Sequence, residues 1–197
     1  MTRCRFSILT LLLGILTLHA TISLAAPRRD PVNARKYAQC MELARKDPDA
    51  AFDWAMDWRD MGGDEAARHC IGVALIGLKL YMEAGNRLEA LAQEMQSEKT
   101  VQAGILAQAA QARHLDRKPA RAIALMNTAL KLSPGNPDLL VDRATMHAGR
   151  GDYIMALTDL NIVLAKDPTR IDALIFRATA LRFTDKLEQA ETAVVSA

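Results

Sequence analysis

The residues in this 197-residue chain that are best suited to chemistry are its cysteines, Cys4, Cys40 and Cys70. Catalytic thiols commonly occur as Cys-x-x-Cys, where a neighbouring group lowers the pKa of one thiol. No such spacing occurs here, so thiol-redox catalysis is the weaker interpretation. Two others stay open, a structural disulfide between Cys40 and Cys70 or two buried, unpaired thiols.

Histidines add the question of a metal site. His69 directly precedes Cys70, whereas His114 and His147 lie far along the chain. Zinc sites in proteins draw on closely spaced pairs such as His-x-x-x-His or Cys-x-x-Cys, and the sequence has neither. We therefore predict no metal site and no cofactor. The alternative function that we retain is a thiol-redox or metal-binding protein using Cys40, Cys70 and His69.

Carboxylates and tryptophans cluster just after the first cysteine of this pair. Asp53, Asp57 and Asp60 fall at i, i+4 and i+7, so they share one helical face and are typical of a polar surface. Trp54 and Trp58 are explained by packing, although two tryptophans on one helix could also anchor a ligand. Because the sequence has neither a Gly-rich phosphate loop nor a nucleophile elbow, we do not expect an enzyme.

The N-terminal segment has the pattern of a secretory signal peptide. Basic residues precede an apolar run from Ile8 to Leu18, and Ser23-Leu24-Ala25 supplies small residues before a cleavage point. The run is much shorter than the roughly 20 residues that a membrane-spanning helix needs. We predict a cleaved signal peptide over 1–25, a short linker over 26–31, and a periplasmic or secreted product with no stable membrane insertion.

Charge and composition narrow the function classes further. Lys and Arg total 25 and Asp and Glu 23, so no basic field is present that would attract nucleic acid. Hydrophobic residues make up 50% of the chain but aromatic residues only 5%, which favours closely packed helices over a β-sandwich. We expect an all-α protein that does not bind nucleic acid.

An internal repeat organises the chain after residue 31. One column of small residues recurs at spacings of 33, 38, 34 and 34: Ala51, Ala84, Ala122, Ala156 and Ala190. A second column precedes the first by twelve residues: Gln39, Gly72, Ala110, Ala144 and Ala178. Small residues at fixed places in consecutive helices let their backbones approach closely. The long second spacing predicts an extra helical turn near Gln93 to Thr100.

These columns resemble the tetratricopeptide repeat (TPR), a 34-residue helix–turn–helix unit, most clearly from Pro137 to Pro168. The resemblance covers five units, at about 32–64, 65–102, 103–136, 137–170 and 171–197. It implies an all-α, right-handed superhelical solenoid with the first helix of each unit on the concave side. First helices of neighbouring units then lie side by side, which favours the disulfide between Cys40 and Cys70.

Boundaries within the repeats follow from local signals. Gly62-Gly63 before Asp64 predicts a helix stop followed by an N-cap. In the last unit we expect a second helix from about Lys186, with an apolar surface that no later repeat covers: Leu187, Ala190, Val194 and Val195. Such a surface marks a contact site, so we expect the C-terminal end to dock on a partner or to form a homo-oligomer.

The resemblance also implies a non-catalytic interaction module that binds an unidentified protein or peptide in its concave groove. Some TPR proteins hold the C-terminal carboxylate of chaperones with a set of Lys, Asn and Arg residues, but only Lys36 occupies a comparable place here, so that clamp is not expected. The other predicted groove residues suit an extended peptide or a partner helix: Cys40, His69, Val73, Ala107, Gln111, His114, Val141, Thr145, Ile175, Thr179 and Arg182.

Overall fold

The computed structural model describes the backbone of residues 31–195 and the side chains of residues 32–184, and this part of the chain contains helices and turns but no strand. The predicted signal peptide over 1–25 lies outside the described residues. The elements in chain order are α1 (Pro31–Lys46), α2 (Pro48–Trp58), a π-helical turn η1 (Arg59–Gly63), α3 (Asp64–Gly77), α4 (Tyr81–Glu94), α5 (Lys99–Leu115), α6 (Pro119–Leu132), α7 (Pro137–Gly149), α8 (Tyr153–Lys166) and α9 (Ile171–Val195).

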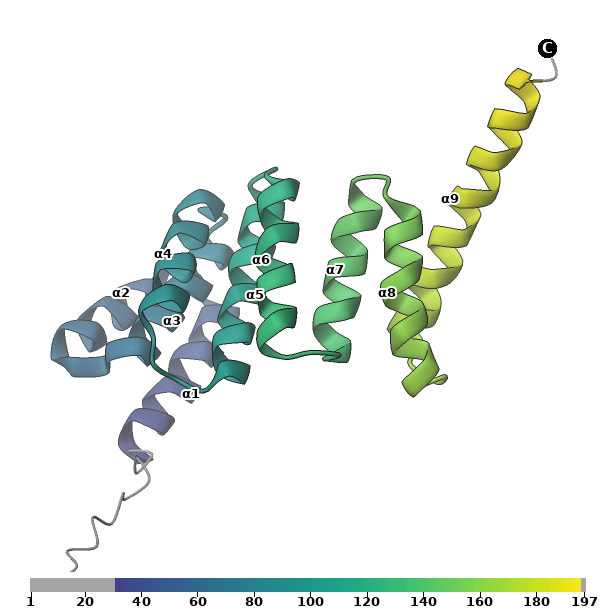
Figure 1. Cartoon of the computed structure of the whole chain (residues 1–197). Helices are drawn as coiled ribbons and strands as arrows, with labels where there is room; N and C mark the ends of the chain where they lie inside the picture. The colour runs from purple at the N-terminus through teal and green to yellow at the C-terminus, as the bar shows by residue number, and fades with distance from the viewer. Residues whose placement is uncertain (1–30, 196–197) are drawn as a thin grey trace, which may run out of the picture.

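The helices form an elongated array of antiparallel pairs, with α1 and α2 at one end and α9 at the other (Figure 1). Consecutive helices pack as hairpins, α1 with α2, α3 with α4, α5 with α6 and α7 with α8. The first helices of successive hairpins also contact one another along the array, from α1 to α3 and onward to α9. This arrangement confirms the predicted all-α solenoid of helix–turn–helix units.

Small residues lie where the helices approach most closely. Ala51, Ala84, Ala122 and Ala156 are all 0% exposed, each near the start of the second helix of its hairpin. Gly72 on α3 faces Leu88 on α4, and a methyl group added at Gly72 would collide with the Leu88 side chain. The buried members of the two columns therefore mark the seams of the first four hairpins, as close backbone packing requires, whereas Gln39 and Ala178 are exposed.

Helix starts follow their local chemistry in two hairpins. The Oδ1 atom of Asp47 accepts a hydrogen bond from the backbone N–H of Ala50 at 3.1 Å, which caps α2. Asn136 caps α7 in the same way, accepting from the backbone N–H groups of Asp138 and Leu139 at 3.0 and 3.3 Å. Both helices have proline in the first turn, where the missing N–H costs no hydrogen bond.

The predicted N-cap at Asp64 was wrong. Asp64 is the first residue of α3, with φ of 41°, and its side chain makes no capping hydrogen bond. The reversal is instead made at Gly62, whose φ of 88° is easily accessible only to glycine. Gly63 then packs against Trp58, and a Cβ at Gly63 would lie 2.7 Å from the indole Nε1 atom.

The predicted second helix of the last unit was also wrong, because α9 runs without a break from Ile171 to Val195. In each of the three preceding hairpins one turn residue has positive φ: Lys79, Arg117 and Gly151. A non-glycine residue pays roughly 1 kcal/mol for this conformation, which packing of a following helix offsets. Asp185 holds the corresponding position, 34 residues after Gly151, and continues the helix instead.

A buried ionic cluster joins α4, α5 and α6. Glu89 on α4 has a 9% exposed side chain, and its carboxylate accepts hydrogen bonds from Arg113 on α5, at 2.5 Å, and from Arg121 on α6. Arg113 also donates to Asn86 at 2.7 Å and lies against Gly85, where a Cβ would be 2.8 Å from its Nε atom. The middle hairpins are thus held by buried charge as well as by apolar packing.

Candidate functional site

The predicted disulfide joins the first two hairpins. Cys40 on α1 and Cys70 on α3 are bonded, with a Cα–Cα distance of 6.1 Å, inside the range that a disulfide needs. Both residues are 0% exposed and lie in an apolar cluster rich in alanine. This confirms the predicted pairing and places Cys40 in the core, so its prediction as a groove residue was wrong.

A cavity of about 500 Å³, called the concave cavity below after the predicted concave side of the array, opens between the first helices of the first three hairpins. Its walls come from α1, α3, the end of α4, the start of α5 and the connection between α4 and α5, and they are mainly apolar. The residues that line it are Asn33, Ala34, Tyr37, Glu65, Ala66, His69, Leu91, Met95, Ser97, Val101 and Ile105. This size is within the range of pockets that bind small ligands or single side chains of a partner.

His69 gives this cavity its main polar feature. Its Nε2 atom donates to the side-chain oxygen of Gln108, so its Nδ1 atom accepts the Tyr37 hydroxyl at 2.7 Å. The Tyr37 and His69 rings also stack, with centroids 5.7 Å apart. Burial lowers the pKa of His69 and therefore favours a neutral imidazole at physiological pH. Since both ring nitrogens have protein partners, His69 acts here as a fixed wall residue.

The extra residues of the second repeat build the far side of this cavity. Helix α5 begins at Lys99, one turn before the position expected from the repeat, which confirms the predicted extra helical turn. Val101 and Ile105 of this region face the cavity. The connection before α5 is held by Glu65 on α3, whose carboxylate accepts from the Gln96 backbone N–H at 3.0 Å and from the Ser97 hydroxyl at 2.5 Å.

The structure divides the predicted groove residues among several environments. Among them, His69 lines the concave cavity, while Thr145 and Thr179 line a smaller cavity of about 120 Å³ beside Phe176, between α7, α8 and α9. Val141 is 5% exposed and belongs to the core, so its prediction as a groove residue was wrong. The others are partly buried or exposed on the first helices: Lys36, Val73, Ala107, Gln111, His114, Ile175 and Arg182.

Sequence reasoning missed most of the cavity wall. Tyr37, Ala66 and Ile105 read in the sequence as ordinary apolar residues of amphipathic helices, so nothing in their type separates them from the core. One signal was present, the 38-residue spacing that displaces the start of α5.

The other candidate residues either pack in the structure or lie exposed on its surface. Trp58 is 1% exposed and packs against Trp54 with ring centroids 5.4 Å apart, which agrees with packing. Asp53, Asp57 and Asp60 are all exposed on one face, as expected. No group of three His, Cys, Asp or Glu residues in the described part of the chain is arranged to hold a metal ion. Nor does any described helix have the length and apolarity to span a membrane.

The expected docking role of the C-terminal end concerns side chains from Leu187 onward, which lie outside the described side chains, so it stays a prediction. Nearer residues of α9 are exposed although apolar, including Ile171 at 72% and Ile175 at 57%. Phe183, also on α9, is 43% exposed and stacks on Tyr153 with ring centroids 4.9 Å apart. The described part of α9 thus has packing on one side only.

Known protein structures share this architecture. The chain matches a chain of the APC/C hetero-tetramer Cut9-Hcn1 with a TM-score of 0.65 and 21% identity, over 76% of this chain but only 29% of that one. It matches a tetratricopeptide repeat protein from Parabacteroides merdae with a TM-score of 0.61 and 16% identity, over 80% and 64% of the two chains. It also matches YrrB, a TPR protein, with a TM-score of 0.57 and 15% identity, over 76% of each chain.

Neither the protein-family models nor the curated protein sequences gave a match to this chain. At identities this low, the structural matches define the fold and leave the function open. The chain therefore has the fold of a TPR-like helical solenoid, with a concave cavity between its first three hairpins.

Proposed function

We propose that this protein is an exported, non-catalytic interaction module that binds an apolar segment of a protein partner in the concave cavity. The observation that carries the proposal is the cavity itself, about 500 Å³ of mainly apolar wall between first helices that face a common side. Partner segments that bury apolar side chains in such a preformed hollow gain affinity from the hydrophobic effect. YrrB, which shares the fold, is described as having an unusual peptide-binding site.

The polar groups around the cavity favour a neutral partner segment. His69 is held neutral by burial, and Tyr37 and Gln108 occupy its nitrogens. Glu65 is engaged by Gln96 and Ser97, so its carboxylate oxygens already have donors. An anionic partner side chain would lose its hydration here without gaining an opposite charge, and a cationic one would find a single carboxylate, Glu65, whose oxygens already accept hydrogen bonds. We therefore expect leucine, methionine or aromatic residues at the contact.

Filling the cavity tests this proposal. Ala34 is exposed on α1 and lines the cavity, so Ala34→Trp is expected to occupy the space while leaving the core intact. Peptides selected on the unmodified protein from a phage-displayed random library should be apolar, and their Kd, measured by fluorescence anisotropy, should rise at least about tenfold in the variant.

The matched control is Ala38→Trp, one turn further along α1, also exposed and not part of the cavity wall. This variant should bind the selected peptides within about twofold of the unmodified protein, a change of less than 0.5 kcal/mol. The proposal fails if the library yields no apolar peptide, or if both tryptophan variants weaken binding equally while their circular dichroism stays unchanged.

Export is supported by the N-terminal sequence pattern and by the buried disulfide, since disulfides persist mainly in oxidising compartments. We expect the exported protein to begin at Ala26, as read by N-terminal sequencing of the periplasmic or secreted fraction. Ala25→Arg, which replaces the small residue before the cleavage point, should cause the uncleaved chain to accumulate. An exported chain that still begins at Met1 would contradict this prediction.

A further inference from the structure

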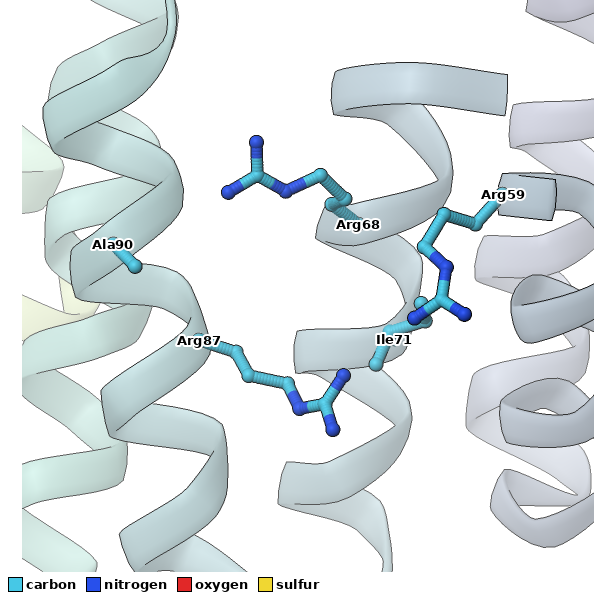
Figure 2. A pocket seen from close by; sticks show the side chains of 5 residues that line it. All are labelled: Arg59, Arg68, Ile71, Arg87 and Ala90. Carbon is cyan, nitrogen blue, oxygen red and sulfur yellow. The ribbon is translucent and has the colours of Figure 1, made fainter. Parts of the chain in front are cut away.

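Three arginines surround a second cavity, on a different face of α3 from the concave cavity. This cavity measures about 170 Å³ and is lined by Arg59 of η1, Arg68 and Ile71 of α3, and Arg87 and Ala90 of α4. Figure 2 shows the three guanidinium groups around an open space beside Ile71. Every polar group in this lining is therefore a cationic hydrogen-bond donor.

Each arginine is held from outside the cavity by one carboxylate. Arg59 pairs with Asp60 at 2.8 Å, Arg68 with Glu94 at 2.7 Å, and Arg87 with Glu83 at 2.7 Å. These carboxylates are 68%, 62% and 44% exposed, and none of them lines the cavity. Exposed ion pairs of this kind are weak, so they balance the charge of the cluster without occupying its centre.

Several guanidinium donors remain for a ligand. Within residues 32–184, Glu83 pairs only with the Nε atom of Arg87. Glu94 pairs with only one terminal nitrogen of Arg68. An anion in the space between the three guanidinium groups would be attracted by all three, although each is also paired with an exposed carboxylate. The side chains are 32% to 37% exposed, which leaves a path for a ligand from solvent.

Local features of the fold that do not contribute to the concave cavity position this arginine cluster. Arg59 follows α2 directly and lies in the π-helical turn that Gly62, with φ of 88°, allows the chain to complete. Gly63 packs against Trp58, which fixes this turn against the core. Ile71 is 1% exposed and gives the cavity an apolar floor, where charge-assisted hydrogen bonds are stronger than in open water.

We propose that Arg59, Arg68 and Arg87 bind a phosphate group in this cavity. Arginine donates two parallel hydrogen bonds to phosphate oxygens, and a tetrahedral dianion offers enough oxygens to engage several guanidinium groups together. The cavity volume is several times the roughly 30 Å³ that one water molecule occupies in the liquid. This volume is large enough for a phosphate group but too small for a peptide segment. Inorganic phosphate and a phosphate monoester offer the same chemistry.

Isothermal titration calorimetry with inorganic phosphate, glycerol 3-phosphate and acetate, at low and constant ionic strength, tests the proposal. The chain from Ala26 should bind inorganic phosphate, and acetate should bind at least about tenfold more weakly. Glycerol 3-phosphate distinguishes the two sources of the group: tighter binding than that of inorganic phosphate indicates an esterified ligand, equal binding shows that the site accepts either form, and much weaker binding indicates the free ion. If phosphate does not bind, or acetate binds equally well, the proposal is overturned.

Variants locate the binding. Arg87→Gln and Arg68→Gln should each weaken phosphate binding about tenfold or more, since each removes a charged donor. Arg45→Gln is the matched control, because Arg45 is an exposed arginine on α1 that pairs with one carboxylate, Glu42, at 2.9 Å. It makes the same change in net charge and should alter the affinity less than about twofold. Equal weakening in all three variants would show a diffuse charge effect and refute the site.

Discussion

Replacing both Cys40 and Cys70 with alanine is expected to lower the free energy of unfolding at the N-terminal end by about 3–4 kcal/mol under oxidising conditions. The bond links residues 30 positions apart and so restricts the unfolded chain. The surrounding core depends on it because many of its residues are alanines, such as Ala44, Ala51 and Ala67, which bury little apolar surface each.

Hydrogen exchange is the suitable measurement, because repeat arrays lose structure unit by unit rather than in one step. Amides of α1 to α3 should lose protection in the double variant, while those of α5 to α8 keep theirs. The reduced, unmodified protein is the control and should match the variant closely. Equal protection of the oxidised and reduced proteins would contradict a stabilising role for the disulfide.

Glu89→Gln is expected to destabilise the middle hairpins by about 3 kcal/mol, since it leaves the buried Arg113 with only a long ion pair, to Asp116 at 3.9 Å. Arg113 is only 10% exposed, and the neutral amide cannot balance its charge or that of Arg121. Glu83→Gln is the control on the same helix. Glu83 is 44% exposed and forms a single exposed pair, so its loss should cost about 0–1 kcal/mol in urea unfolding.

The destabilisation by Glu89→Gln should depend on pH in a defined direction. Burial is the largest single effect and raises the pKa of Glu89, but the hydrogen bonds and positive charges of Arg121 and Arg113 together outweigh it, so the pKa lies below the ordinary glutamate value. A lowered pKa in the folded state means that the stabilisation is present above the unfolded value, near 4.3, and is lost as the pH falls through the folded value. The two proteins should therefore converge in stability in acid.

Much of the fold was predictable because its determinants are local and periodic. Ala84, Ala122 and Ala156 recur at a spacing that only stacked hairpins explain, and all are fully buried. The disulfide followed from the same spacing, because Cys40 and Cys70 occupy first helices of adjacent units. The helix break expected before Lys186 is not present. A turn residue with positive φ is unfavourable unless a following helix packs against the preceding one, and local sequence does not supply that packing.

The sequence by itself determined the helical class and the order of the first four hairpins, which depend on short-range pattern and repeat length, and it favoured the cysteine pairing. Only the tertiary structure decided where the two cavities lie. Tyr37 and His69 meet at the concave cavity from different helices, and Arg59, Arg68 and Arg87 meet on a different face of α3. A cavity is the volume that packing fails to fill, and it depends on how separate helices stack, which no single stretch of sequence encodes.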